Sequence, residues 1–558
     1  LHTASGKAAT YTPPTTPSGN IQPVTIEAFA TADHAKNVVA NINVTGFAGI
    51  LKGTYVFETK GEDANGAFQL AGVIVLDGNG NVTSGEQTHN DPLLSVSDAI
   101  TGGSYTIGPD DRGTLTLNTA DSNIGQKGIE NLALVVLSNA KVFIATLDNT
   151  NPTLNLPPSN ETSSGTLELQ TSAAAPGGGY AFAVSGVDIN NQSLAVGGIF
   201  NIDSPNKISG TGSIADEDDG GTLTSSSTLS GTVTAPDSLG SAKFNLAAGF
   251  APALQFTAYI VDATHIKLIE SDNAGSGAGF GSTAGVAIGQ GGATGTFKSN
   301  SSFAGSYVFH ILGRDPDEIP TSLASVGQFT ADSSGNLING YSDEEMIALN
   351  LEISDSFTGT YTLDPSGTGR VDSNITFATS GPGPELIFYL TGNGNPPVVL
   401  DADDNPSSSG VGATGMGLAH PQAASLSSPS FNGKYGVRYT QGNGVGVDND
   451  ATGQITVNGL SGIFSNMSVV DTDDGFKPAP DTQFSGTFAT VPSGARFAGT
   501  LFNSSFPSPN PAVPSTIAVA FYLVNPDYGF FIETDSSTSG ELTLGSFATR
   551  TPVCSACP

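Results

Sequence analysis

The sequence predicts an all-β protein made of four tandem copies of one antiparallel, eight-stranded unit. Three observations predict this fold: a Gly-x-Tyr motif that recurs about every 125 residues, turn-forming residues at about ten-residue spacing, and the lack of a convincing helical pattern. Val, Ile, Phe and Tyr are interspersed with turn-forming residues, among them 71 glycines, and only 12% of the residues are charged. Disordered chains carry dense charge and few apolar residues, so we expect this chain to fold.

The repeat is anchored by a Gly-x-Tyr-x-Phe motif, in which the fourth copy has Val437 in place of phenylalanine. The four tyrosines are separated by 125, 127 and 128 residues. Their segments are Gly53-Thr-Tyr55, Gly178-Gly-Tyr180, Gly305-Ser-Tyr307 and Gly433-Lys-Tyr435. An apolar run that ends in an Asx- or Gly-containing turn follows each tyrosine, as tight hairpins require. We therefore interpret the tyrosine and phenylalanine as core residues of the first strand of each unit.

Each unit contains about eight short strands of 5 to 7 residues, which indicates an antiparallel meander. Eight such strands can close on themselves and so remove exposed edges. We expect lipocalin-like barrels, with a two-sheet sandwich as the alternative. The expected units are residues 51–172, 173–295, 296–425 and 426–558. Residues 343–352 (DEEMIALNLE) are the best helical candidate, and residues 275–279 (GSGAG) are interpreted as a link between the second and third units.

Residues 1–50 differ from the repeats and are expected to form a partial immunoglobulin-like β segment. Tyr11-Thr-Pro-Pro14, the segment 24–28 (VTIEA) and the segment 38–44 (VVANINV) resemble the last strands of bacterial immunoglobulin-like domains. A complete domain of that type needs about seven strands. An incomplete one leaves a sheet edge open to a strand of another chain. Head-to-tail contacts of this kind generate filaments when they do not close into a ring, so we expect self-association into a polymer.

The repeats also resemble a group of uncharacterised secreted proteins of Acidobacteria-type bacteria. The resemblance rests on the Gly-x-Tyr-x-Phe motif, the Asp77-Gly-Asn-Gly turn, the Arg-containing turns at Asp111-Arg-Gly and Gly367-Thr-Gly-Arg370, and the Ile532-Glu-Thr-Asp535 strand end. It covers nearly the whole chain, although the second copy lacks the Arg-containing turn. The resemblance implies secretion and a repeat architecture, and it implies no activity.

The net charge of −33 argues against binding to nucleic acid or to anionic lipid, because both need clustered Lys and Arg. No basic patch is evident along the sequence. No run approaches the roughly 18 to 20 apolar residues that span a bilayer, so membrane insertion is not expected. Leu1 and the Thr/Pro/Ser-rich segment after it resemble a processed, mature N-terminus. We therefore expect an extracellular or cell-surface protein.

Acidic strand ends are the nearest approach to a catalytic pattern. The pairs are Glu270/Asp272, Asp401/Asp403 and Glu533/Asp535. Residues i and i+2 of a strand share a face, so two carboxylates could flank a glycosidic bond or bind a cation. The alternative is that they are exposed polar residues before a turn, and this is the interpretation that we adopt.

Other sites are equally sparse. Alternating acidic residues in two turns, Asp401, Asp403, Asp404 and Asp471, Asp473, Asp474, have oxygens suited to a weak Ca²⁺ site. No other cofactor is expected. Cys554 and Cys557 are the only cysteines, and we expect a local disulfide or a tether to a neighbouring chain. No spacing typical of a metalloenzyme, a nucleophile elbow or a phosphate loop is present, so an enzyme is not expected.

The sequence thus favours a secreted structural subunit of an extracellular filament or surface assembly, which polymerises through residues 1–50. The alternative is a monomeric cell-surface adhesin or carbohydrate-binding repeat protein whose partners are extracellular matrix or glycans. Sugar binders usually display aromatic platforms, often Trp. This chain has no Trp, and its Tyr and Phe recur at core positions.

Overall fold

The computed structural model describes the central 22–551 region with internal gaps. The residues left out within it are 31–32, 45–46, 64–65, 93–94, 148–160, 205, 250–252, 273–280, 316–320, 347–350, 403–412, 443–447, 475–477, 491–493, 504–515 and 536–541. The four described helices are short 3-10 turns: η1 (Phe47–Ile50), η3 (Gly291–Ala293), η4 (Asn300–Ser302) and η5 (Ser428–Ser430). Within the same residues, no helix is long and apolar enough to cross a membrane.

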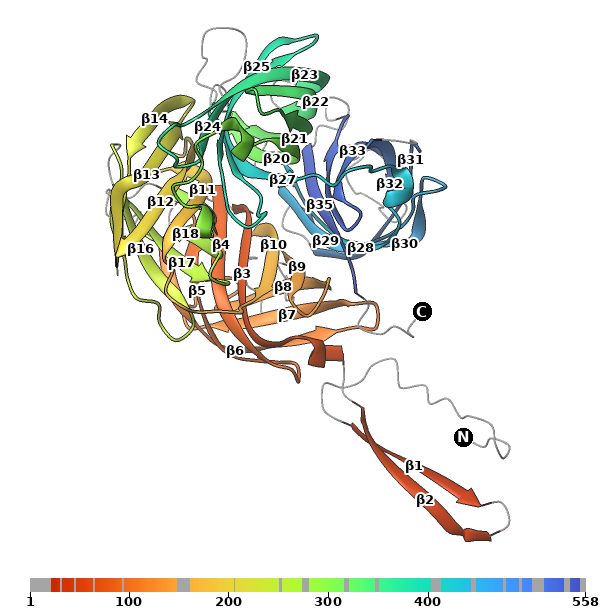
Figure 1. The fold of residues 1–558 in the computed structure, drawn as a ribbon. Coiled ribbons are helices and arrows are strands. Elements are labelled where there is room, and N and C mark those ends of the chain that lie inside the picture. The colour runs from red at the N-terminus through yellow and green to blue at the C-terminus, as the bar shows by residue number, and fades with distance from the viewer. Residues whose placement is uncertain are drawn as a thin grey trace.

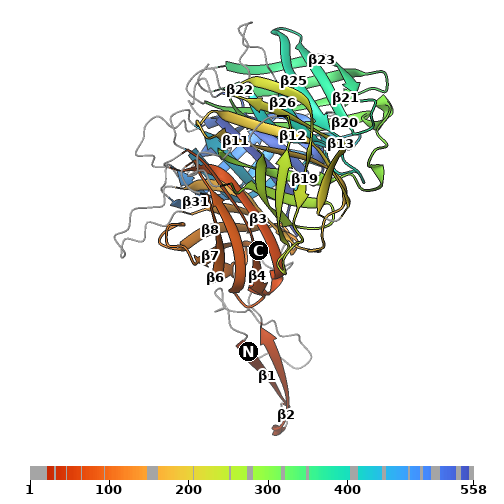
Figure 2. The same ribbon diagram turned by 90° about the vertical axis from the view of Figure 1, so that its left-hand side faces the viewer.

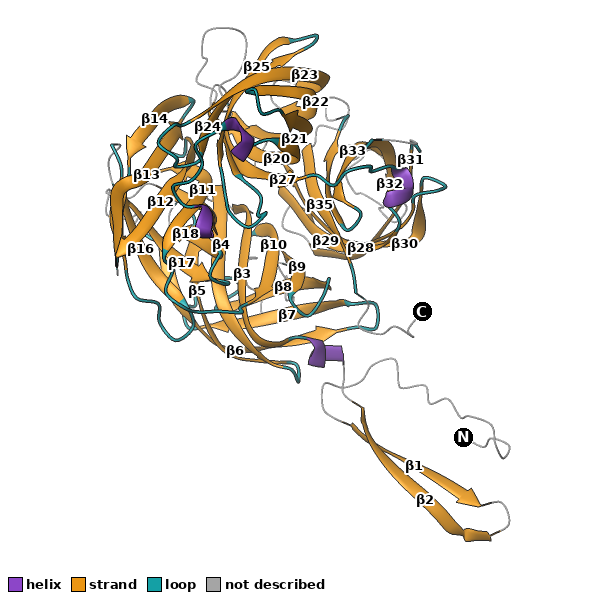
Figure 3. Cartoon of the chain, viewed as in Figure 1, coloured by secondary structure: helices purple, strands orange, loops and turns teal. Residues whose placement is uncertain are grey.

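The predicted all-β fold is confirmed, because four antiparallel barrels follow one another along the chain (Figures 1 and 3). Barrel 1 comprises β3 (Lys52–Asp63), β4 (Gly66–Asp77), β5 (Asn81–Asn90), β6 (Ser95–Ile107), β7 (Arg112–Thr119), β8 (Ile129–Val136), β9 (Lys141–Thr146) and β10 (Thr162–Leu169). Barrel 2 comprises β11 (Gly178–Asp188), β12 (Ser193–Ser204), β13 (Lys207–Asp219), β14 (Thr222–Thr228), β15 (Ser230–Val233), β16 (Ser241–Ala247), β17 (Leu254–Ile260), β18 (His265–Glu270) and β19 (Gly281–Gly289). Its fourth strand is split into β14 and β15, so it keeps the eight-stranded plan.

The other two barrels repeat this order. Barrel 3 comprises β20 (Gly305–Asp315), β21 (Thr321–Ala331), β22 (Asn336–Met346), β23 (Leu351–Leu363), β24 (Arg370–Phe377), β25 (Gly381–Tyr389), β26 (Val398–Ala402) and β27 (Thr414–Pro421). Barrel 4 comprises β28 (Gly433–Gly442), β29 (Asp448–Asn458), β30 (Ile463–Asp474), β31 (Pro478–Phe488), β32 (Arg496–Asn503), β33 (Thr516–Asn525), β34 (Tyr528–Glu533) and β35 (Leu542–Thr549). In every barrel the last strand pairs with the first, which closes the ring of hydrogen bonds.

Each barrel has its own apolar core, and the repeat motif supplies its first strand. The four motif tyrosines are buried, and each lies in a different core cluster. These residues are Tyr55, Tyr180, Tyr307 and Tyr435. The prediction that the motif marks a core strand is therefore confirmed.

Two local predictions are wrong. The described residues of the segment 343–352 are strand, since Asp343 to Met346 belong to β22 and Leu351 and Glu352 begin β23. Its good helix formers are overridden by sheet pairing, which fits the weak, context-dependent nature of such propensities. The segment 275–279 lies in the chain between β18 and β19 of barrel 2, so it does not link two barrels.

The strands are also longer than the 5 to 7 residues predicted from the sequence. β6 and β23, for example, have 13 residues each. The first half of each pairs only with the preceding strand, so these hairpins extend beyond the closed part of the barrel.

The N-terminal segment forms a separate hairpin of β1 (Gln22–Ala30) and β2 (Asp33–Val44). Its two strands pair with each other in antiparallel register from Gln22 with Val44 onwards, and with no strand of a barrel. Figures 1 and 2 show the hairpin projecting away from the barrels. Two paired strands fit the expected β segment, and its immunoglobulin-like character stays a prediction.

The four barrels form a closed ring, in which barrel 4 returns to barrel 1. Apolar side chains are buried between barrels 1 and 2, between 2 and 3, between 3 and 4, and between 4 and 1. Figure 1 shows this order as orange, yellow-green, green and blue barrels around a common centre. The inner wall of the ring is built from the first and last strands of the barrels.

Candidate functional site

The interfaces of the ring repeat one arrangement, in which an acid of one barrel meets an Arg–Tyr pair of the next. Between barrels 2 and 3, Arg370 Nε donates to Asp216 Oδ2 over 2.7 Å and Arg370 Nη2 donates to Asp216 Oδ1 over 2.9 Å. Tyr389 Oη donates to the same carboxylate over 2.6 Å. Arg370 and Tyr389 are cross-strand partners on β24 and β25. Burial raises the pKa of Tyr389 well above its usual value, and the charge of Asp216 adds to this effect.

The same arrangement joins barrels 3 and 4. Arg496 donates from Nε and Nη2 to Asp343, each over 2.7 Å, and Tyr522 Oη donates to that carboxylate as well. Asp343 occupies on β22 the register position that Asp216 occupies on β13. The interface is therefore a property of the repeat.

The two interfaces of barrel 1 are variants of the arrangement. Between barrels 4 and 1, Arg112 Nη1 donates to Asp471 over 3.1 Å, and Val135 replaces the tyrosine. Between barrels 1 and 2, the acid is replaced by Thr88, whose hydroxyl lies 2.9 Å from Tyr259 Oη. Barrel 2 also lacks the arginine, because Ser241 is the cross-strand partner of Tyr259 at the position that Arg370 has opposite Tyr389. This interface therefore has neither partner of the ion pair.

A glutamine after the last strand forms a second repeated contact between barrels. Its Nε2 donates to a backbone carbonyl of the next barrel at the same repeat position, over 2.8, 2.9 and 3.1 Å in turn. The pairs are Gln170 with Ile260, Gln290 with Leu390 and Gln422 with Leu523. Arg550 occupies the fourth position and instead donates to Asp111 Oδ2 over 2.6 Å. Because the fourth contact, that of Arg550, is made with barrel 1, the four barrels form a closed ring.

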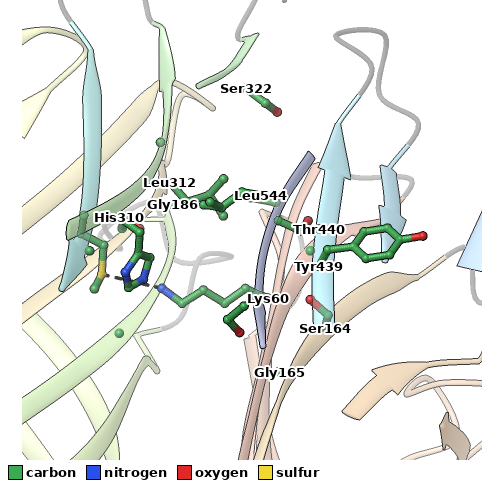
Figure 4. A pocket seen from close by; sticks show the side chains of 18 of the residues that line it. Lys60, Ser164, Gly165, Gly186, His310, Leu312, Ser322, Tyr439, Thr440 and Leu544 are labelled. Atoms are coloured by element: carbon green, nitrogen blue, oxygen red, sulfur yellow. Dashed lines mark hydrogen bonds between the residues drawn. The ribbon is translucent and has the colours of Figure 1, made fainter. Parts of the chain in front are cut away.

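A cavity of about 260 Å³ lies where the four barrels meet, and we call it the central cavity. Its wall comes from the first and last strands of every barrel. Figure 4 shows Lys60 of β3 extending across this cavity toward the ring of His310 of β20. Basic residues far apart in the sequence come together here. Lys60, Arg314 and Arg438 line the cavity, and Lys267 lies behind its wall against Glu58.

Two of these cations are neutralised by carboxylates. Lys267 Nζ lies 2.5 Å from Glu58 and 3.2 Å from Glu168, which joins barrel 2 to barrel 1. Arg314 Nη2 lies 2.6 Å from Glu62 and joins barrel 3 to barrel 1 across the ring. Burial alone would lower the pKa of Lys267, but Glu168 and Glu58 outweigh burial and raise it.

Lys60 and Arg438 have no such partner. No carboxylate oxygen of the described residues lies within 4 Å of Lys60 Nζ or the Arg438 guanidinium, and Lys60 donates instead to the Ala284 carbonyl over 2.5 Å. Burial lowers the pKa of Lys60 to about 8, against the opposing charge of Glu58. Burial also lowers the pKa of His310 to about 3, and the charge of Arg438 acts in the same direction.

Four glycines at the same repeat position set the last strands tightly against the first strands at this wall. They are Gly165, Gly285, Gly417 and Gly545. A Cβ on Gly417 would lie 1.6 Å from the His310 carbonyl oxygen, and one on Gly165 would lie 1.7 Å from that of Glu58. No other residue type fits at such positions without a backbone shift.

Four residues of the acidic strand ends are buried, so their interpretation as exposed residues is wrong. Each is at most 5% exposed: Glu270, Asp272, Asp401 and Glu533. Glu270 accepts a hydrogen bond from Thr283 over 2.8 Å, and Glu533 accepts one from Thr543 over 2.8 Å. The alternation of β18 directs Glu270 inward beside Ile266 and Leu268, which are core residues. Their positions favour a structural role.

The predicted Ca²⁺ residues are separated in the chain and only partly described. Asp401 is buried on β26, while Asp403 and Asp404 lie outside the described residues. Asp471 is bound to Arg112, and Asp473 and Asp474 follow it on β30. No group of three metal-ligating side chains occurs among the described residues. Cys554 and Cys557 also lie outside those residues, so the Ca²⁺ and disulfide predictions stay predictions.

Comparisons with known proteins identify no family. No protein-family model matches the chain, and no curated protein matches it. Among solved structures, a mutant transferrin-binding protein B from Haemophilus parasuis aligns with 10% identity over 74% of this chain and 83% of that chain, with a TM-score of 0.17. A protein of unknown function of the DUF3598 family from Nostoc punctiforme aligns with 10% identity over 45% of this chain and 98% of that chain, with a TM-score of 0.14. Because both TM-scores lie far below 0.5, nothing about the function of this chain is drawn from them.

Proposed function

We propose that this chain is a secreted, non-catalytic structural protein, the subunit of an extracellular filament or surface assembly. The β1–β2 hairpin is the part that docks on the next subunit. The observation that carries this proposal is the pairing of the hairpin: its strands bond only to each other, whereas every barrel closes on itself. An isolated two-stranded hairpin is marginally stable in water. Its outer edges offer backbone N–H and C=O groups to a further strand.

The closed ring supports the same proposal by elimination. Each barrel already uses two faces on its neighbours within the chain, through apolar clusters at all four interfaces and through an Arg–Asp pair at three of them. Those faces are therefore not available to a second copy. The first halves of β6 and β23 also have an unpaired edge. Among the described elements the hairpin is the β pair that belongs to no barrel, so we expect self-association through β pairing to use it.

The charge and composition fit a surface role. A net charge of −33 keeps a protein dispersed and away from anionic polymers. The resemblance to uncharacterised secreted repeat proteins of Acidobacteria-type bacteria agrees with export. No catalytic arrangement was predicted from the sequence. The buried ion pairs Arg370–Asp216 and Arg496–Asp343 connect neighbouring barrels, which is a structural role.

Electron microscopy of the purified chain, with and without residues 22–46, tests the proposal. We expect filaments or oligomers of the full chain, and ring-shaped monomers of the deletion variant with unchanged thermal unfolding. A peptide with the β1 sequence (QPVTIEAFA) should inhibit assembly, and a scrambled peptide should not. A full chain that stays monomeric at high concentration would contradict the proposal. Glycan-array binding by such a monomer would instead support the adhesin alternative.

A further inference from the structure

The central cavity contains more positive charge than the surrounding protein neutralises. The charged residues of its wall are Glu58, Lys60, Glu62, Arg314 and Arg438. Glu62 is bound to Arg314, and Glu58 is bound to Lys267 from behind the wall. Lys267 also binds Glu168, so four cations face three carboxylates here, and Lys60 and Arg438 are the two cations without a carboxylate contact. Only 18 of the 558 residues are Lys or Arg, so two half-buried cations without a carboxylate contact at one cavity require an explanation.

The free donors of these two cations point to a ligand. Lys60 Nζ has three N–H bonds, of which one goes to the Ala284 carbonyl and a second faces Met416 Sδ at 3.8 Å. Arg438 Nε is buried and has no hydrogen-bond partner among the described residues. The Arg438 guanidinium lies 5.9 Å from the centre of the Phe143 ring, a contact that uses the face of the guanidinium and not its N–H groups. Both side chains are half-buried, and the partial removal of a charge from water without a partner is unfavourable.

We propose that the central cavity binds one compact oxyanion, held between Lys60 Nζ and the Arg438 guanidinium. Sulfate, phosphate and the carboxylate of a small acid share this chemistry, because each accepts charge-assisted hydrogen bonds from an ammonium and from the fork of an arginine. The volume of about 260 Å³ accommodates such an ion with several waters, since one water occupies about 30 Å³. The acidic exterior, with a net charge of −33, disfavours large polyanions.

The site depends on the ring, because no single barrel contains it. Lys60 comes from barrel 1, Arg438 from barrel 4, and His310 and Met416 from barrel 3, while Ala284 belongs to barrel 2. The buried His310 ring stacks on Phe530 at 4.2 Å and forms an uncharged side of the cavity. An ion bound at this point would contribute to holding the four barrels together. This role is independent of the hairpin, so the proposed function and the anion site can fail separately.

Isothermal titration calorimetry of the full chain at constant chloride concentration tests the site. The probes are inorganic sulfate, inorganic phosphate, glucuronate and, as the uncharged analogue of glucuronate, glucose. We expect one site per chain for at least one of the three anions and no binding of glucose. Sulfate or phosphate binding would identify a free inorganic ion as the ligand, and binding of glucuronate alone would identify a carboxylate-bearing small molecule.

The variants Lys60→Met and Arg438→Gln should each weaken binding roughly 10- to 100-fold, because each removes a charge-assisted contact. Lys60→Arg keeps the charge and should retain binding, which separates loss of the site from loss of folding. Lys434→Met removes an exposed lysine from β28, the strand that carries Arg438, and should leave the affinity unchanged. The proposal would be overturned if no anion bound. It would also be overturned if wild type and Lys60→Met bound all three anions with equal affinity, because the binding would then be adventitious.

Discussion

The Arg370 guanidinium holds the carboxylate of Asp216 with two parallel hydrogen bonds of 2.7 and 2.9 Å across the boundary between two barrels. Asp216 is fully buried and Arg370 is 5% exposed. Replacing a buried pair of this kind by apolar residues is often neutral, whereas removing one partner is costly. We therefore expect the Arg–Asp pairs to favour one orientation of each barrel against the next.

Asp216→Asn should destabilise the chain far more than a change at the same repeat position in barrel 1. The variant leaves a buried guanidinium without its charged partner, which costs about 3 to 5 kcal/mol. Thr88→Ala removes only a neutral hydroxyl contact and should cost about 1 kcal/mol. Equilibrium urea unfolding of both variants measures the difference. Equal losses would show that the Arg–Asp pair is not the stabilising element of the interface.

Arg112→Gln should open the ring between barrels 4 and 1 without unfolding a barrel. This interface has the smallest buried apolar cluster, made of Val135, Leu137 and Phe143 with Ala548 against them. It therefore relies most on the bonds of Arg112 to Asp471 and of Arg550 to Asp111. We expect a larger radius of gyration by small-angle scattering and faster amide exchange in β8 and β9, with unchanged circular dichroism. Arg496→Gln, at a larger apolar interface, should leave the ring closed.

Gly417→Ala should destabilise barrel 3 by about 3 kcal/mol or more. The new Cβ would lie 1.6 Å from a backbone oxygen of the adjacent strand, which a side-chain movement cannot relieve. Gly292→Ala is the matched control, because nothing lies within 4 Å of its Cβ position. This control should be neutral or stabilising by about 0.4 to 1 kcal/mol. Thermal unfolding of the two variants provides the comparison, and similar melting temperatures would contradict it.

The chain should become less stable as the pH rises from about 5 to about 8. Burial, with the charge of Glu161, raises the pKa of Glu130 from 4.5 to about 8, and burial with Asp219 raises the pKa of Glu217 to about 7. A carboxyl whose pKa is higher in the folded state binds more protons there than in the unfolded state. Its stabilising contribution is thus complete below the unfolded pKa and is lost as the pH rises through the folded pKa.

For Glu130 alone, the slope in this window is about 1.4 kcal/mol per pH unit at most. Glu130→Gln should remove that part of the slope and be more stable than wild type at pH values above the folded pKa. His310 acts in the opposite sense in acid: its lowered pKa causes a loss of stability as the pH falls below about 6.5. Urea unfolding across the pH range measures the free energy of unfolding and so tests both effects. A flat profile for wild type would contradict the prediction.

The barrels were predictable because their signals are local and repeated. The Tyr55 motif recurs in phase, and the turns between hairpins use residues that accept the required backbone angles, such as Gly78 and Gly80 with φ of 81° and 94°. The failed helix at 343–352 shows the limit of this approach. Asp343 has a partner, Arg496, that lies 153 residues away, and no local pattern reveals it.

The site was not predictable for the same reason. Lys60, Arg314 and Arg438 are isolated along the sequence, and only ring closure brings them to one cavity. One signal was available in the sequence: aligning the four copies puts Gln170, Gln290 and Gln422 at one position after the last strand. An amide retained in phase outside the core is typical of a contact between units.

Closure of the ring also limits how many copies of the unit can pack against one another in one molecule. In open solenoids each repeat contacts only its neighbours, so units can be added or lost by recombination at little cost. Here Arg112 of the first unit must meet Asp471 of the last. A chain with three or five units would present complementary faces without a partner in the same molecule, and it would associate with other copies.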